Sequence, residues 1–335
     1  MEQKSEVYHI VAAPNDKYMR YTLVLFESIF VTNPGKHFHF HVLHSRLGKE
    51  RMDQVTEYVT ARGGEITFIC VDESKYRELP SMTDRISIET YFRLEIQDLL
   101  PEEVERALYL DGDMIVCGDL AELYHTDFEG NSIAACGFSA RCEQGGEFNA
   151  GMILFNLKQM RGTITFETYR SLAERMEEGY YMDQGLLNEL FGKDATKYVW
   201  KQRYNFTCPF YRKFKKQIET EDASFTLDDV VVMHYTGPGI RPWEAEFSPK
   251  EIEGIKKKNL RDIFASNGIL LDDLYFRFLA KWWEHAANTP VYEELKHDMY
   301  ESKSRILSDA LLKTIDTKEY AVGYRILRLA RKIKR

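Results

Sequence analysis

Two aspartates separated by one glycine follow a short apolar stretch in ALYLDGDMIV, residues 107–116. The stretch predicts a buried strand that ends at Asp111, and open α/β sheets bind ligands beyond the carboxyl ends of such strands. Because Gly112 adds little bulk, the carboxylates of Asp111 and Asp113 can face one hard divalent cation. Such a cation, Mg²⁺ or Mn²⁺, would bridge the protein to phosphate oxygens and neutralise a leaving group. The alternative is a turn whose aspartates cap the following segment.

A histidine ends a second apolar stretch and is a candidate third ligand. His234 closes VVVMH, and the loop TGPGIRPW begins at residue 236. The imidazole at the strand end could complete a metal site. Gly237 and Gly239 would let the backbone approach a phosphate, to which Arg241 could donate two hydrogen bonds. A core histidine followed by an ordinary loop is the alternative.

Two further segments combine polar and small residues. In EFNAGMILFN, residues 147–156, Asn149, Ala150 and Gly151 precede a predicted strand, and their size and hydrogen-bonding groups suit a ligand that carries hydroxyls. In MDQGLLN, residues 182–188, Asp183 and Gln184 open a predicted helix. From the residues alone, a turn without a ligand and an N-cap are the favoured interpretations.

Three histidines alternate in HFHFHVLH, residues 37–44. Alternation along a strand puts His37, His39 and His41 on one face. They could bind a metal, but a half-exposed strand face is the interpretation that we favour.

Strands and helices alternate in the first 250 residues. Strands separated by helical segments predict βαβ units and a mostly parallel sheet, so the fold class is α/β and Rossmann-like with flanking helices. The expected strands are Val7–Ala13, Phe38–His44, Ile66–Val71, Ala107–Leu110, Ile133–Cys136, Met152–Phe155 and Val230–His234. The expected helices are Tyr18–Val31, Lys49–Arg62, Ser87–Leu100, Thr165–Glu178 and Asp183–Leu190.

The pattern changes near residue 248, after which charged helical segments replace the strands. We therefore predict a catalytic domain over residues 1–248 and a helical C-terminal region over residues 249–335. An apolar stripe over residues 271–283 has helical spacing and should pack against the main domain.

The charge of the chain restricts its partners and its location. A net charge of −8 disfavours non-specific nucleic-acid binding, which needs a cationic field. The five cysteines form no CxxC motif, and charges interrupt every apolar run near the N-terminus, so a reduced, cytoplasmic protein is expected.

The C-terminal residues 320–335 differ from the acidic body. They carry six cations and no acid, and the apolar residues between them share one helical face. A basic amphipathic helix can lie in the interface of an anionic bilayer, which predicts peripheral association with the inner face of the cell membrane. A terminal helix packed on its own domain is the alternative.

Taken together, the motifs resemble those of the family 8 glycosyltransferases, which have the GT-A fold. The family includes bacterial lipopolysaccharide α-glucosyl- and α-galactosyltransferases and is related to glycogenin. The resemblance covers roughly residues 7–245. Its segments occur in the family's order as IVAAPNDKY, ISIETYFRL, YLDGDMIV, FNAGMILFN, MDQGLLN and HYTGPGIRPW.

The resemblance implies an enzyme that moves glucose or galactose from a UDP-sugar to a saccharide or lipid-linked saccharide, with retention of configuration. It implies Mn²⁺ or Mg²⁺ at Asp111, Asp113 and His234, donor hydroxyls held by Asp183, and Gln184 beside the anomeric carbon as nucleophile or stabiliser. It also implies a set of donor-binding positions. Ala13, Asn15 and Tyr18 would hold uracil and ribose, and Gly237 and Arg241 would close over the diphosphate. The full set is Ala13, Asn15, Tyr18, Arg93, Gly112, Asn149, Ala150, Gly151, Gly237 and Arg241.

The sequence departs from the family pattern at two positions. Asn15 stands where many members have Asp, and Arg241 replaces the lysine of His-x-x-Gly-x-x-Lys-Pro-Trp after one extra residue. Arginine and lysine contact phosphate differently, so the departure concerns the diphosphate directly.

Two other functions are compatible with parts of the sequence. The segment DGDMIV also resembles the opening motif of haloacid-dehalogenase-like phosphatases, with Asp111 as nucleophile and Asp113 as acid and base. That motif usually begins its domain, whereas three strand–helix units come first here. A UDP-sugar-binding protein without transfer activity is the second alternative.

Overall fold

The computed structural model describes residues 6–77, 79, 87–137, 146–175, 182–192, 195–236, 241–243 and 273–301. The chain forms two compact units, one of Met1–Tyr235 with Ala280–Val291 and the other of Thr236–Leu279 with Tyr292–Arg335. The predicted boundary near residue 248 and the basic tail, residues 320–335, lie outside the described residues.

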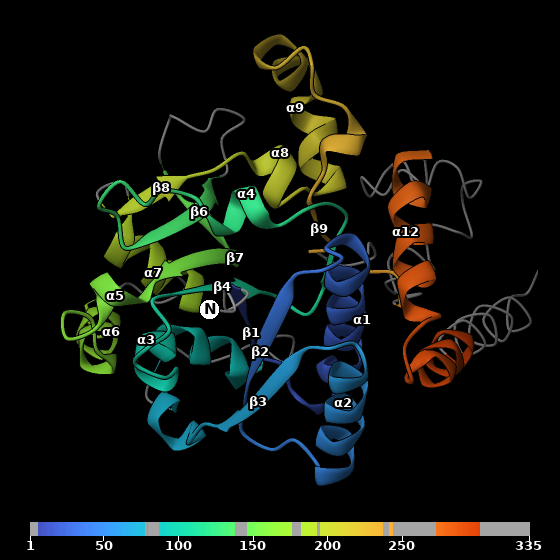
Figure 1. The fold of residues 1–335 in the computed structure, drawn as a ribbon. Coiled ribbons are helices and arrows are strands. Elements are labelled where there is room, and N and C mark those ends of the chain that lie inside the picture. Colours follow the sequence, from blue (N-terminus) through green and yellow to red (C-terminus); the bar gives the residue numbers. More distant parts are fainter. Residues whose placement is uncertain are drawn as a thin grey trace, which may run out of the picture. The chain divides into compact units, whose positions relative to one another are not determined.

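The first unit contains a seven-stranded sheet with the order β3-β2-β1-β4-β7-β6-β8 (Figure 1). Strand β7 is antiparallel to both of its neighbours, and the other neighbouring pairs are parallel. The α/β class with a mostly parallel sheet is therefore confirmed. The strands are β1 (Val7–Ala12), β2 (His37–His44), β3 (Glu65–Cys70), β4 (Arg106–Leu110), β6 (Ile133–Gly137), β7 (Phe148–Asn156) and β8 (Thr196–Tyr198).

Helices α1 (Asp16–Thr32) and α2 (Lys49–Ala61) lie beside strands β1 to β3 (Figure 1). The even-numbered aromatic residues of β2 face α1. The rings of Phe26 and Phe40 are 4.1 Å apart, and Phe30 contacts both Phe38 and Phe40 edge-on. Side chains alternate between the faces of a strand, so the odd-numbered residues of β2 point to the opposite face.

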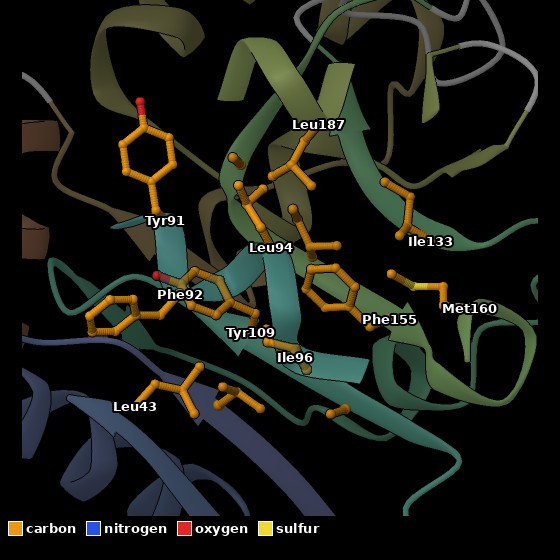
Figure 2. Packing of buried hydrophobic residues seen from close by; sticks show 14 of the residues in the cluster. Leu43, Tyr91, Phe92, Leu94, Ile96, Tyr109, Ile133, Phe155, Met160 and Leu187 are labelled. Carbon is orange, nitrogen blue, oxygen red and sulfur yellow. The ribbon is translucent and has the colours of Figure 1, made fainter. Parts of the chain in front are cut away.

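A large hydrophobic cluster packs against that opposite face. Figure 2 shows Leu94, Phe155 and Leu187 together in this cluster, although they come from three segments far apart in the sequence. Its residues come from the sheet and from the 3₁₀ helix η2 (Ile88–Glu95) and helices α3 (Ile96–Leu99), α5 (Leu157–Met160), α6 (Phe166–Ala173) and α7 (Met182–Phe191). The cluster fixes η2 and α7 relative to the sheet.

One predicted helix has a different form. Instead of an α-helix over Ser87–Leu100, the chain forms the 3₁₀ helix η2 followed by the short α3, and Ser87 makes no side-chain cap hydrogen bond. Such a long 3₁₀ segment is uncommon and often marks a functional region. Here it carries Arg93, which is buried.

The remaining elements connect this framework. They are η1 (Glu73–Tyr76), β5 (Met114–Val116), α4 (Ala121–Tyr124), α8 (Lys201–Tyr204), α9 (Cys208–Glu221), η4 (Leu227–Asp229), β9 (Val232–His234) and α12 (Asp273–Ala286). Trp282, from the apolar stripe of α12, is buried and lies near Tyr21 of α1, as expected of a packed helix. Among the described helices, none combines the length and the apolar composition that a membrane span requires.

Candidate active site

The pairing of β4 with β7 brings two of the predicted segments together. The two strands are antiparallel, so the start of β7 lies beside the carboxyl end of β4, with Leu110 opposite Met152. The backbone N–H of Asp111 donates to the carbonyl of Gly151 over 2.8 Å. The Asp-Gly-Asp turn and the Asn-Ala-Gly segment are therefore neighbours at one edge of the sheet.

A second pairing brings in the histidine. Strand β5, which begins directly after Asp113, pairs antiparallel with β9, and Met114 is opposite His234. The backbone N–H of Tyr235 also donates to the carbonyl of Asp113 over 2.9 Å. The histidine is thus placed by a two-stranded sheet, of which β9 lies within the predicted strand Val230–His234 and β5 was not predicted.

Asp111, Asp113 and His234 form one group, here called the Asp–Asp–His cluster. Each residue offers a ligand atom, and these atoms lie within 4.8 Å of one another. The His234 Nε2 and Asp113 Oδ1 atoms are 3.1 Å apart, and both residues are buried, whereas Asp111 is partly exposed. Two carboxylates and one imidazole, open on one side, suit Mn²⁺ or Mg²⁺ with room for further oxygen ligands.

Gly151 keeps space beside this cluster. A Cβ atom at this position would lie 2.6 Å from Cε1 of His234 and 2.8 Å from Oδ2 of Asp111. Both distances are shorter than van der Waals contact, so any larger residue would displace two of the three candidate ligands. The arrangement of the residues therefore fits a bound cation.

A chain of amides fixes the orientation of His234. The backbone N–H of Gly151 donates to Oδ1 of Asn149, which identifies that atom as an acceptor. Asn205 lies 2.9 Å from the same oxygen and therefore donates to it through Nδ2. Oδ1 of Asn205 then faces Nδ1 of His234 at 2.9 Å, and that nitrogen must carry the proton. Nε2 is left with its lone pair towards the cluster, which is the tautomer that a metal ligand needs.

Arg93 of η2 is buried among several acceptors. Its guanidinium lies 3.0 Å from Asp111 Oδ1 and 3.0 Å from Asp183 Oδ2, and it donates to the carbonyl of Ala150. Burial lowers the pKa of Arg93, but the carboxylates of Asp111 and Asp183 outweigh this effect, so the pKa is raised and the cation is retained. The guanidinium also stacks over the ring of Tyr109, 4.3 Å from its centre. Arg93 therefore joins the sheet edge to α7.

Asp183 and Gln184 occupy the first turn of α7 and face the same region. Burial raises the pKa of Asp183, and Arg93 offsets this only in part. The Oε1 atom of Gln184 accepts from the backbone N–H of Ala150 at 3.1 Å and from Nδ2 of Asn149 at 3.2 Å. Both side chains thus have roles beyond helix capping, because each contacts the other predicted segments.

The residues expected to hold uracil and ribose lie after β1. Ala13 is partly buried, Asn15 caps α1 by accepting from the N–H of Tyr18, and Tyr18 packs edge-on against Tyr21. A Cβ on Gly112 would lie 2.5 Å from the hydroxyl of Thr22 and 3.7 Å from the Tyr18 ring, so the first two turns of α1 contact the Asp-Gly-Asp turn.

The positions of two predicted site residues relative to the cluster are not described. Gly237 lies outside the described residues, and Arg241 belongs to the second compact unit. Conversely, the sequence analysis missed Asn205 and Tyr109, which contact His234 and Asp111. Asn205 lies in no recognisable motif, whereas Tyr109 lies in β4 two residues before Asp111, which directly follows the strand, and could have been found from alternation.

A protein-family model and several known proteins match this chain. Residues 9–246 match the sequence model of Glycosyl transferase family 8. A lipopolysaccharide 1,3-galactosyltransferase of Salmonella typhimurium is 27% identical over 237 residues, which are 65% of this chain and 67% of that protein. A lipopolysaccharide 1,2-glucosyltransferase of Escherichia coli is 23% identical, covering 71% of this chain and 74% of that protein.

Solved structures show the same fold. An active-site glutamine-to-glutamate mutant of LgtC is 26% identical, has a TM-score of 0.62, and covers 80% of this chain and 99% of its own. The galactosyltransferase LgtC in complex with donor and acceptor sugar analogs has a TM-score of 0.59 at 26% identity, covering 81% of this chain and 99% of its own. The GT-A fold and the expected family resemblance are confirmed, and the phosphatase alternative is not supported. The chain belongs to glycosyl transferase family 8 and is a glycosyltransferase.

Proposed function

We propose that the protein transfers glucose or galactose from a UDP-hexose to a saccharide acceptor, with retention of the anomeric configuration and with Mn²⁺ or Mg²⁺. The observation that carries the proposal is the convergence of Asp111, Asp113 and His234 to within 4.8 Å, beside residues suited to bind a sugar. The names of the lipopolysaccharide glucosyl- and galactosyltransferases among the relatives support a hexose donor and a cell-surface glycan as product.

The Asp–Asp–His cluster would hold the cation. When bound, the cation supplies positive charge that offsets the charge developing on the departing UDP. Asn205 keeps the His234 Nε2 lone pair available, and Gly151 leaves the space that the cluster requires. The tyrosine hydroxyl of Tyr109 donates to Asp111 over 2.9 Å and holds that carboxylate in place.

Donor binding would use both sides of the cluster. Ala13, Asn15 and Tyr18 lie after β1, where they would contact uracil and ribose. On the other side, Arg93 orients Asp183, whose carboxylate would accept from sugar hydroxyls. This division would put the nucleotide over α1 and the hexose over α7, with the diphosphate between them.

Transfer would occur on the front face of the sugar. The bond from the anomeric carbon to the UDP oxygen breaks, the acceptor oxygen bonds to the same face of that carbon, and the acceptor proton passes to a phosphate oxygen of UDP. The Oε1 atom of Gln184 is engaged in two hydrogen bonds. This supports a stabilising or positioning role for Gln184 over nucleophilic attack, for which a neutral amide is poorly suited.

The acceptor and the location are part of the same proposal. A lipid-linked saccharide would lie at the membrane surface, and the basic residues 320–335 would hold the enzyme there from the cytoplasmic side. The tail lies outside the described residues, so its composition is the support for this step.

A donor panel tests the proposed function. The full-length protein is incubated with UDP-glucose, UDP-galactose and UDP-N-acetylglucosamine in the presence of Mn²⁺, and UDP release is measured with and without a panel of saccharide acceptors. The proton coupling constant of the product reports its anomeric configuration. Release from one UDP-hexose and an α-linked product are expected, whereas an inverted product or no release from any donor would contradict the proposal.

A further inference from the structure

A second group of potential metal ligands lies on the sheet away from the active site. His9 of β1 and His39 and His41 of β2 offer one ring nitrogen each, and these nitrogens lie within 4.8 Å of one another. We call the three residues the tri-histidine cluster. His9 pairs with His39 in the register of β1 and β2, and His41 is two residues further along β2 on the same face.

The cluster is separate from the Asp–Asp–His cluster. Ile10 pairs with Leu108 of β4, so His9 is level with Ala107, four residues before Asp111. At about 3.3 Å per residue this is about 13 Å along the strand. One ion could not be shared by the two groups, and nothing in the proposed transfer reaction uses these histidines.

The three rings are closely packed. The rings of His39 and His41 are stacked with centres 4.2 Å apart, and Nδ1 of His9 lies 3.0 Å from Nε2 of His41. Four-coordinate Zn²⁺ with Zn–N bonds of about 2.0–2.1 Å separates its ligand nitrogens by about 3.3 Å. The distance between Nδ1 of His9 and Nε2 of His41 would therefore have to increase by only a few tenths of an ångström to accept an ion.

The protonation and hydrogen bonding of the rings also suit a cation. Burial, with the neighbouring imidazoles, lowers the pKa of His9 to about 4 and that of His41 to about 3, so both rings are neutral at neutral pH. His41 is fully buried, and among the described residues its Nδ1 has no hydrogen-bond partner. Because Nε2 of His41 is the atom next to His9, Nε2 would bind the ion and Nδ1 would carry the remaining proton of the ring.

Neighbouring oxygens could orient the cluster. Nε2 of His39 lies 2.8 Å from the hydroxyl of Thr67, and its Nδ1 is 3.9 Å from Glu65. Histidine ligands commonly donate their second N–H to such groups, which fixes the ring and raises its basicity. Glu65 also pairs with His37 at 2.6 Å, so His37 lies outside the cluster, bound to a carboxylate.

We propose that His9, His39 and His41 form a zinc site that links β1 to β2. An all-imidazole site suits Zn²⁺ over Mn²⁺ or Mg²⁺, which prefer oxygen ligands. The two clusters would therefore select different metals, and the zinc ion would stabilise the pairing of β1 with β2 without taking part in transfer.

Zinc binding is tested in a background in which the active-site cluster is weakened. Full-length Asp113→Asn protein is stripped of metal with a chelator, the chelator is removed, and Zn²⁺ affinity and stoichiometry are measured by calorimetry. Co²⁺ absorption in the visible range reports the coordination geometry. One Zn²⁺ per chain and a tetrahedral Co²⁺ spectrum are expected.

His39→Gln and His37→Gln, each added to that background, are the matched variants. Both residues are partly exposed on the same strand face, so neither change should unfold the protein, which circular dichroism verifies. The His39 variant should bind Zn²⁺ at least about 100-fold more weakly, because even loss of an outer partner costs 10–100-fold. The His37 variant should bind as the parent does.

Three results would overturn the proposal. They are the absence of Zn²⁺ binding in the parent, unchanged affinity after His39→Gln, and an equal loss after His37→Gln. If the His39 variant does not fold, His9→Gln provides the same comparison, since this residue is also partly exposed. The Asp113→Asn protein used here should be unable to carry out transfer. A negative result for Zn²⁺ binding is therefore independent of the proposed transferase activity.

Discussion

Replacing Asn205 by alanine should weaken cation binding, although none of the three metal-ligand residues is replaced. The residue is fully buried, and its side chain joins Nδ1 of His234 to Oδ1 of Asn149 at 2.9 Å on each side. Asn205→Ala removes both contacts, so His234 can rotate and can adopt the wrong tautomer. Loss of such an outer partner typically costs 10–100-fold in metal affinity, or about 1.4–2.8 kcal/mol.

The same change should also reduce folding stability. The imidazole N–H and the amide oxygen that remain are buried, and each unpaired polar group costs about 1–3 kcal/mol. A control must therefore separate lost stability from lost metal binding. Asn33→Ala serves, because Asn33 is equally buried and its amide holds the N–H of Leu120 and the carbonyl of Ile29 at the end of α1.

The assay is a Mn²⁺ titration of the full-length proteins by calorimetry, with chemical denaturation in parallel. Both variants should lose stability, and only Asn205→Ala should lose 10–100-fold in Mn²⁺ affinity. Unchanged affinity in Asn205→Ala, or an equal loss in Asn33→Ala, would refute the argument that the amide chain sets the His234 tautomer.

Three other changes have distinct expected results. Gln184→Ala should lower kcat much more than it weakens UDP-hexose binding. Saturation kinetics and equilibrium-binding measurements would separate the two effects. A collapse of donor affinity with normal turnover would instead show that Gln184 is a binding residue. Burial and Lys281 lower the pKa of His285 to about 4. The unfolded chain therefore binds a proton at this residue near pH 6.5, whereas the folded chain does so only near pH 4. The free energy of unfolding should consequently fall as the pH drops through this interval. His285→Gln should show a smaller fall in Tm between pH 6.5 and 4, and an unchanged fall would count against this assignment. A chain ending at Thr317 should release UDP normally but no longer sediment with anionic vesicles at low salt, and failure of the full-length protein to sediment would contradict the role of the tail.

The sequence was sufficient to identify the sheet and the cluster because strong local signals mark both. Asp111, Asp113 and His234 each follow an apolar stretch, and the carboxyl ends of strands in an α/β sheet gather at one edge. Their actual approach depends on the pairing of β5 with β9. Strand β9 lies within the predicted strand Val230–His234, whereas β5 has three residues and gives no periodic signal. The pairing could therefore be expected from the family resemblance but not from local pattern.

Other features depend on tertiary contacts that a single sequence does not contain. Asn205 lies in an unremarkable segment and gains its role only through His234 and Asn149. The 3₁₀ form of η2 is a second example, because its sequence has an ordinary helical pattern. Likewise, alternation placed His39 and His41 on one face, but their meeting with His9 requires the register of β1 against β2, and the full burial of His41 differs from the half-exposed face that we expected.

The metal requirement of UDP release tests the central claim most directly. Metal-free full-length protein is assayed with its preferred UDP-hexose before and after addition of Mn²⁺, beside Asp113→Asn and the control Asp119→Asn, whose exposed carboxylate pairs with Lys36. Mn²⁺ should restore release in the wild type and in Asp119→Asn, and Asp113→Asn should remain folded and inactive. Full release in excess chelator, or normal Mn²⁺-dependent release by Asp113→Asn, would contradict the assignment of this cluster as the catalytic metal site.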